Sequence, residues 1–212
     1  MSNKSDVRNM LKDAIILFSI TLIAGLVLGF VYELTKEPIR LQQEKAIQEA
    51  CRAVFEDAAS FEAIEYTPSE TLAGELKENG VEIGSAYEAL DASGNHMGFV
   101  VETTTSEGYG GNITLYLGVR EDGTINGISI LEIDETPGLG MKADDVLKPQ
   151  FRNKKVSSFT YTKSGSKSDS EIDAISGATV TTKAVTYAVN GGLRAIQEEL
   201  VTLVGEGGNS NE

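Results

Sequence analysis

An uncharged apolar stretch near the N-terminus constrains this chain more than any other feature. It runs from Ala14 to Tyr32 as AIILFSITLIAGLVLGFVY, 19 residues without a charged side chain. At about 1.5 Å per residue, a helix of this length covers roughly 28 Å, close to the hydrocarbon thickness of a bilayer. The run is longer than the apolar core of a secretory signal peptide, and the ELTKEPIR that follows contains no small-residue cleavage site. We therefore predict an uncleaved transmembrane anchor over residues 14–34, preceded by a tail of residues 1–13.

The charges that flank this stretch do not fix the direction in which it crosses the membrane. Three basic residues precede it and three follow it: Lys4, Arg8 and Lys12, then Lys36, Arg40 and Lys45. The positive-inside rule therefore gives no decision. A short tail, a single span and a large following domain favour a cytoplasmic N-terminal tail and an extracytoplasmic domain at the cell membrane.

Composition excludes several classes of function. The chain has 18 Lys and Arg residues against 32 Asp and Glu residues, a formal net charge of −14 at pH 7. Such a chain repels a phosphate backbone, so we expect no nucleic-acid partner. One cysteine, Cys51, and one histidine, His96, are too few for a disulfide framework, a cysteine-ligated zinc site or an iron–sulfur cluster. We expect no metal site, and redox chemistry would need an organic cofactor.

The chain after the apolar stretch predicts an α+β domain, a mainly antiparallel sheet with packed helices. Pro38 suits a helix start, and apolar residues at helical spacing predict a stalk helix within residues 35–60. Residues 67–79 predict a loop with a short helical piece. Three strands are indicated by β-branched and aromatic residues: Met97–Thr105, Ile113–Val119 and Thr124–Ile133. Asp122-Gly123 predicts a hairpin between the last two.

The C-terminal part of the chain predicts one long helix and a tail. Apolar residues at helical spacing run from about Thr181 to Leu203, with an interruption at Gly191 and Gly192. The final GEGGNSNE is polar and predicts a flexible tail over residues 205–212. The folded domain is thus expected to cover residues 61–204.

Two glycine-containing loops could hold a flat ligand, although each alone is also explained as a turn. SEGYGGNI places Tyr109 and Gly110 between two predicted strands, where backbone could approach a ring closely and the tyrosine could lie against it. ETPGLG combines a proline with two glycines, and its Glu135 and Thr136 could present a carboxylate and a hydroxyl to a heterocycle. A β-turn or a solvated surface turn would use the same residues.

A third loop lies directly before the last helix, in the sequence SGATVTT. The small residues Ser176, Gly177 and Ala178 leave room at a helix N-terminus, where free N–H groups and the helix dipole favour an anion. Threonine hydroxyls follow them at positions 179, 181 and 182. A phosphate and ordinary threonine N-capping both fit this pattern.

The three loops together, in this order, resemble the FMN-binding domain shared by the G subunit of the Rnf electron-transport complex and the C subunit of the sodium-translocating NADH:quinone reductase. The resemblance implies that a flavin transferase moves FMN from FAD onto the threonine that closes the SGAT core, which here is Thr179. It makes Asp173, Ser176, Gly177 and Ala178 the recognition context. Thr181 and Thr182 would then be helix-cap residues.

The resemblance also implies which residues surround the isoalloxazine ring. These are Glu135, Thr136, Pro137, Gly138, Leu139 and Gly140, with the backbone near Tyr109 and Gly110. Lys142 is a candidate for charge pairing with the flavin or its phosphate. No side chain is expected to act as an acid, base or nucleophile toward a substrate.

The function implied is that of a membrane-anchored flavoprotein subunit. Its covalent FMN would relay electrons among other subunits of an ion-translocating ferredoxin:NAD oxidoreductase, without independent substrate turnover. A tether keeps the flavin at an effective concentration in the millimolar range or above, which supports an extracytoplasmic domain. Two alternatives stay open: the FMN subunit of a sodium-translocating NADH:quinone reductase, and a membrane-anchored flavin-binding sensory module outside any electron chain.

Overall fold

The computed structural model describes residues 4–203, so the predicted tail at 205–212 lies outside the described residues. The chain divides into two units between Ala46 and Ile47.

The N-terminal unit is formed by α1, which runs as one helix over Lys4–Val54 and continues into the second unit. Its most apolar window has a mean hydropathy of 2.7 and no buried residue, as expected of a span rather than a core helix. In residues 4–203 it is the one helix long and apolar enough to cross a membrane. The predicted helix start at Pro38 is wrong, because Pro38 lies inside α1. A proline removes one helical hydrogen bond, and the helix formers on both sides maintain the helix across that gap.

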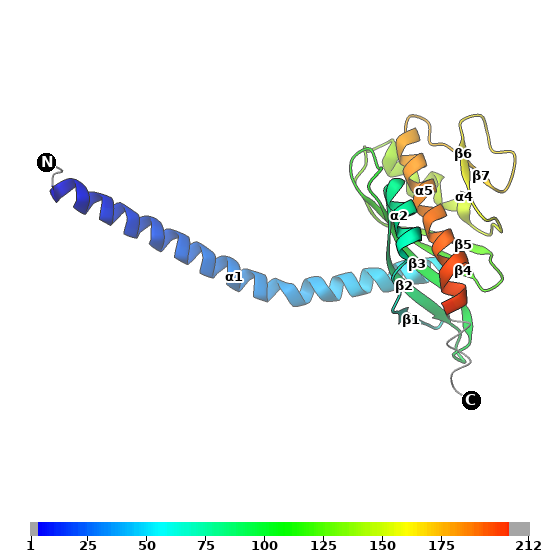
Figure 1. Cartoon of the computed structure of the whole chain (residues 1–212), viewed down its shortest axis with the longest axis horizontal. Coiled ribbons are helices and arrows are strands. Elements are labelled where there is room, and N and C mark those ends of the chain that lie inside the picture. Colours follow the sequence, from blue (N-terminus) through cyan, green and yellow to red (C-terminus); the bar gives the residue numbers. More distant parts are fainter. Residues whose placement is uncertain (1–3, 204–212) are drawn as a thin grey trace. The chain divides into compact units, whose positions relative to one another are not determined.

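The second unit contains a five-stranded antiparallel sheet in which each strand pairs with the next along the chain (Figure 1). Its strands are β1 Ser60–Ile64, β2 Val81–Leu90, β3 His96–Thr105, β4 Ile113–Arg120 and β5 Ile125–Ile133. The predicted mainly antiparallel sheet is confirmed, and β3, β4 and β5 match the three predicted strands. The strands β1 and β2 were not predicted.

Helix α5, Thr179–Ala195, covers one face of this sheet and continues into a π-helical turn, Ile196–Leu200. Gly191 and Gly192 do not interrupt it, contrary to the sequence prediction. A Cβ at Gly191 would lie 2.8 Å from a methyl carbon of Val81, so this glycine lets the helix approach the sheet closely. Helix α2, Glu70–Glu78, is capped by Ser69 and packs at the same end of α5 as the turn.

The remaining short elements follow β5 and precede α5. They are a 3-10 turn Gly140–Lys142, α3 Ala143–Val146, α4 Lys148–Phe151, and the parallel strand pair β6 Thr160–Thr162 and β7 Glu171–Asp173. They bring the chain from the end of β5 to the start of α5.

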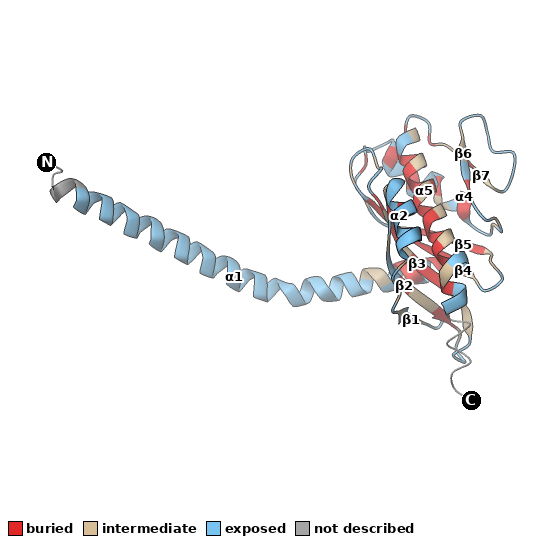
Figure 2. Cartoon of the chain, in the orientation of Figure 1, coloured by how far each residue is buried: buried red, intermediate tan, exposed pale blue. Residues whose placement is uncertain are grey.

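The opposite face of the sheet is covered by the last turns of α1. Neighbouring residues of a strand point to opposite faces, and Leu117 of β4 packs in the α5 core while Tyr116 packs with Cys51 and Phe55. Figure 2 shows buried residues gathered in the sheet and in α5. The folded unit therefore begins at Ile47 and not at residue 61, because the end of α1 belongs to its core. Burial raises the pKa of the Cys51 thiol to about 12, so it acts here as a small apolar packing group.

Candidate functional site

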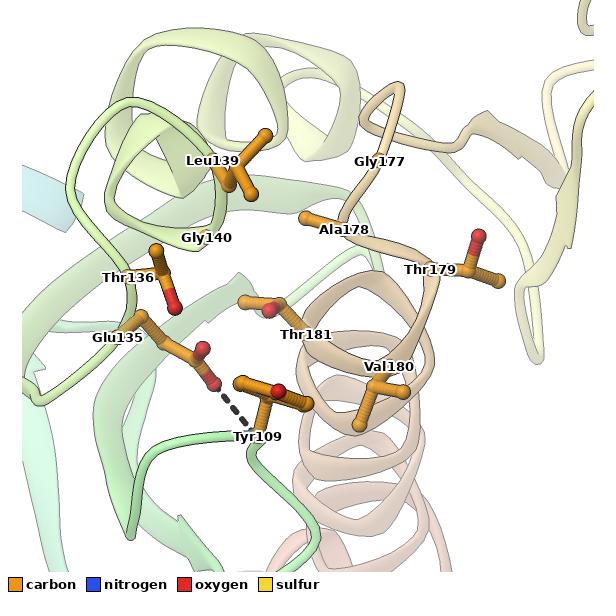
Figure 3. Close-up of a pocket in the computed structure, with 10 residues that line it drawn as sticks. All are labelled: Tyr109, Glu135, Thr136, Leu139, Gly140, Gly177, Ala178, Thr179, Val180 and Thr181. Carbon is orange, nitrogen blue, oxygen red and sulfur yellow. Dashed lines mark hydrogen bonds between the residues drawn. The ribbon is translucent and has the colours of Figure 1, made fainter.

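A cavity of about 460 Å³ lies at the N-terminal end of α5 (Figure 3). Its lining comes from the β3–β4 loop, the chain after β5 and the segment that enters α5: Tyr109, Glu135, Thr136, Leu139, Gly140, Gly177, Ala178, Thr179, Val180 and Thr181. Three loops that are far apart in the sequence therefore meet at one place. Eight of the predicted site residues are among the lining, while Val180 and Thr181 were not predicted to face a ligand.

The β3–β4 loop reaches the cavity because its glycines allow backbone to lie against backbone. A Cβ at Gly110 would lie 2.0 Å from the carbonyl oxygen of Asp134, a distance that no side chain permits. The backbone N–H of Tyr109 donates a hydrogen bond of 2.7 Å to Glu135 Oε1, and the Tyr109 side chain is 74% exposed. Gly110 itself does not line the cavity, so its role in the described structure is to join the two loops.

The chain after β5 places a carboxylate inside the cavity wall. Glu135 is 6% exposed, whereas the neighbouring Thr136 is exposed. A Cβ at Gly140 would lie 2.7 Å from both Glu135 Oε2 and the Thr181 hydroxyl, so these three residues fit together only with glycine at 140. Among the predicted residues of this loop, Pro137, Gly138 and Lys142 are exposed and do not line the cavity.

The start of α5 has no side-chain cap. The N-cap residue is Ala178, and no side chain bonds to the first N–H groups of the helix. The prediction that Thr181 and Thr182 are the caps is therefore wrong. The Thr182 hydroxyl instead accepts a hydrogen bond from the Ile175 N–H at 3.1 Å and donates one to the Ala178 carbonyl at 2.9 Å. It thereby fixes the loop that leads into the helix.

The three threonines at this helix start differ in accessibility. Thr181 is 1% exposed and Thr182 is fully buried, whereas Thr179 is half-buried. Figure 3 places Thr179 at the edge of the cavity, with its side chain directed away from Glu135 and Tyr109. Of the three hydroxyls, that of Thr179 is the one that a second protein could reach.

Asp173 and Ser176, both predicted as recognition context, do not line the cavity. Asp173 ends β7, and its carboxylate accepts hydrogen bonds from the backbone N–H and the hydroxyl of Ser166. Its backbone N–H and carbonyl are both bonded to the Gln150 amide, at 2.7 and 3.1 Å. Asp173 is thus held rigidly beside the helix start, while Ser176 is exposed there.

The residues that form this site match a family model. Residues 108–194 match the FMN-binding domain, a range that contains all three loops of the cavity. Residues 1–54 match the RnfG N-terminal region, which covers α1. The class of the folded unit is therefore that of an FMN-binding domain attached to an N-terminal apolar helix.

Known relatives place the chain more narrowly. It is 33% identical over 195 residues to the G subunit of the Na(+)-translocating ferredoxin:NAD(+) oxidoreductase complex of Acetobacterium woodii, covering 91% of this chain and 94% of that one. It is 32% identical over 185 residues to the G subunit of the proton-translocating ferredoxin:NAD(+) oxidoreductase complex of Clostridium ljungdahlii, covering 86% and 87%. The chain belongs to the family of Rnf complex G subunits.

A solved structure, NqrC of Shewanella oneidensis, also aligns with this chain. The TM-score is 0.48 at 23% identity, over 57% of this chain and 61% of that one.

Proposed function

We propose that this protein relays electrons through a single FMN bound covalently to Thr179, as a subunit of an ion-translocating ferredoxin:NAD oxidoreductase complex. The relatives named above are G subunits of such complexes, and the FMN-binding domain model matches the part of the chain that forms the cavity. The observation that carries the proposal is the position of one accessible threonine hydroxyl at an uncapped helix start, on the edge of that cavity.

The residues present fit an FMN. The cavity volume of about 460 Å³ falls within the range of roughly 300–1,000 Å³ typical of small-molecule pockets. Apolar side chains of Leu139 and Val180, the Tyr109 ring and the polar groups of Glu135 and Thr136 suit a flat ring with a polar edge. The free N–H groups at the start of α5 suit the phosphate.

Attachment requires only one group of this chain to react. The Thr179 hydroxyl oxygen would form a bond to the FMN phosphorus of FAD, the bond between the two FAD phosphates would break, AMP would leave, and the hydroxyl proton would pass to solvent. A flavin transferase is the partner required for this step. The start of α5 then stabilises the negative charge that remains on the phosphodiester, while Thr182 keeps the loop in place.

The bound FMN supplies the redox chemistry, and the protein supplies position and environment. Electrons would pass to and from cofactors on other subunits of the complex, without substrate turnover by this chain alone. The names of the relatives give different ions, sodium in one and a proton in the other. The proposed function therefore includes ion translocation by the complex without specifying the ion.

We further infer that α1 anchors the protein in the cell membrane, with the flavin domain on the extracytoplasmic side. A covalent tether is useful where a dissociated flavin would be lost by dilution. Protease added to sealed right-side-out spheroplasts should therefore digest the domain beyond Ile47. Digestion that occurs only in inverted vesicles would reverse this orientation.

The covalent bond is tested by co-expressing the full chain with a flavin transferase. The parent protein should give a fluorescent band on a denaturing gel and a mass increased by that of FMN less one water. Thr179→Ala should lose both signals, because it removes the acceptor oxygen. Thr181→Ala, the same substitution two residues further along the helix, should keep them, because the Thr181 hydroxyl is buried. A fluorescent Thr179→Ala protein would refute attachment at Thr179.

A further inference from the structure

The carboxylate of Glu135 is a negative charge inside the cavity wall, and we propose that it sets the redox potential of a flavin bound there by opposing the added negative charge of reduction. This inference rests on the proposed function, since it requires FMN in the cavity. The redox potential of the flavin is a separate property from its attachment, because FMN could be attached to Thr179 whatever its potential.

The contacts of Glu135 leave one oxygen free for a ligand. Oε1 accepts the 2.7 Å hydrogen bond from the Tyr109 N–H, which fixes the orientation of the carboxylate. Oε2 has no hydrogen-bond partner among the described residues, although the side chain is 6% exposed. It lies close to Gly140 and Thr181, which both line the cavity. Oε2 is not among the enclosed polar atoms of the described residues, so it is open to the cavity and can accept a hydrogen bond from a ring N–H there.

Among the described residues that line the cavity, none offers a positive side chain to Glu135. Of the described residues that line it, Glu135 is the one with a charged side chain. Lys142, which the sequence suggested as a charge partner, is exposed and does not line the cavity. Lys183, on α5, lies 3.7 Å from the carboxylate of Glu107 and over the Tyr187 ring. The cavity therefore carries a net negative charge from its own wall.

Burial makes this charge effective. The interaction of two charges is inversely proportional to the dielectric constant, so it is several-fold stronger beside a buried group than in water, and salt screens it less. An electron that a flavin in this cavity accepted without a proton would add a negative charge near Glu135. The carboxylate would thus favour the oxidised form relative to an anionic reduced form and lower the midpoint potential.

Glu135→Gln separates this electrostatic effect from the structural role of the residue. Glutamine keeps an oxygen for the Tyr109 N–H and the same shape, and it removes the charge. The full chain, loaded by a flavin transferase, is poised at a fixed potential and its flavin absorbance is recorded. We expect the ratio of reduced to oxidised flavin in Glu135→Gln to exceed that in the parent by about tenfold, the order expected for a charge within several ångströms at an intermediate dielectric constant.

Asp134→Asn is the matched control, because it removes the same charge from the adjacent, exposed residue. Solvent screens that charge, so the ratio should change by less than about twofold. Equal shifts in the two variants, no shift in Glu135→Gln, or a shift toward the oxidised form would each overturn the role of Glu135.

A second variant covers the case in which Glu135→Gln fails to fold or to accept flavin. Leu139→Lys adds a positive charge to an exposed residue of the cavity lining and leaves Glu135 in place. Leu139 lines the cavity and Asp134 does not, so the added charge would lie nearer a bound flavin and should raise the ratio of reduced to oxidised flavin, by less than Glu135→Gln does because Leu139 is partly screened. An unchanged ratio would contradict control of the potential by cavity charge. A parent protein that never takes up flavin contradicts the proposed function itself, whereas a loaded parent whose variants do not shift contradicts only this inference.

Discussion

The two ends of the helix that covers the sheet differ in how far their polar groups are satisfied. Beyond the C-terminal end of α5, Glu199 accepts hydrogen bonds from the Tyr66 hydroxyl at 2.6 Å and from the Ser69 N–H at 3.3 Å. Arg194 pairs there with Glu75 at 2.9 Å and with Glu198 at 2.8 Å. The N-terminal end, by contrast, has no side-chain cap and borders the cavity.

This difference indicates that the two ends of the helix have different roles, one in folding stability and the other in ligand binding. Contacts at the C-terminal end tie α2 and the chain before it to α5 and contribute to folding stability. At the N-terminal end the free donors cost stability unless a ligand satisfies them, and such local departures from full satisfaction are expected at functional sites. Between the two ends, α5 is held against the sheet by close packing, as at Gly191 beside Val81.

The largest effect is expected where a substitution separates the C-terminal part of α5 from the sheet. Gly191→Leu would place a side chain where a Cβ is already 2.8 Å from Val81, a stiff β-branched residue. We expect a loss of about 2–3 kcal/mol in unfolding free energy, typical of overpacking a core. Urea unfolding of the full chain in detergent, followed by the near-ultraviolet circular dichroism of its tyrosines, measures this loss.

The control for this variant is Gly74→Leu in α2, where nothing lies within 4 Å of an added Cβ. There the better helix propensity of leucine should raise the stability by up to about 1 kcal/mol. A destabilisation of similar size in both variants would show that the cost at Gly191 does not come from close packing against Val81.

The sequence predicts the strands of this unit whose composition is typical of a sheet. The strands β3, β4 and β5 are rich in β-branched and aromatic residues and lie within a few residues of their predicted bounds. The strand β2 escaped prediction because Glu82, Gly84 and Ser85 interrupt its apolar pattern, at a shift in its pairing with β3. The turns of α1 that pack on the sheet have the same helical pattern as the stalk before them, so only tertiary contacts reveal where the folded unit begins.

At the site, glycines and small residues predict the three loops, and the structure brings these loops together around one cavity. Which residues of a loop face the cavity depends on its turn geometry. Pro137 and Gly138 lie at the exposed turn, whereas Leu139 and Gly140 face inward. Thr181 was misassigned as a cap because the predicted helix began about two residues late, whereas α5 begins at Thr179 and Thr181 lies within its first turn.

A smaller effect is expected from Thr182→Val, which disturbs only the N-terminal end. Valine has the shape of threonine but leaves the buried Ile175 N–H without its acceptor, at a cost of about 1–3 kcal/mol. Because this bond fixes the loop before Thr179, the yield of covalent flavin should also fall. Urea unfolding measures the loss of stability, and in-gel fluorescence of the same preparation measures the yield of covalent flavin.

Thr186→Val is the matched control, one helical turn further along. Its hydroxyl donates to the Thr182 carbonyl at 2.8 Å, and its loss leaves that carbonyl within the helix hydrogen-bond pattern. It should cost less stability than Thr182→Val and leave the flavin yield unchanged. An equal fall in yield for both variants would mean that the helix start is not held specifically by Thr182.

The smallest effect is expected at the C-terminal end and depends on pH. Desolvation alone would raise the pKa of Glu199, but hydrogen bonds from Ser69 and Tyr66 lower it below its ordinary value of 4.5. A carboxyl group whose pKa is lower in the folded state contributes stability above its unfolded pKa, and this contribution is lost as pH falls through the folded pKa. Glu199→Gln should therefore cost about 1 kcal/mol at neutral pH, as expected for hydrogen bonds to a partly exposed charged group, and less as the pH falls below about 4.5.

Urea unfolding of parent and variant at neutral and acidic pH measures the difference. The control is Glu198→Gln, which removes one partner of a surface ion pair and should cost at most about 0.5 kcal/mol. A constant difference between parent and Glu199→Gln across this pH range would show that the carboxylate of Glu199 does not hold this end of the helix.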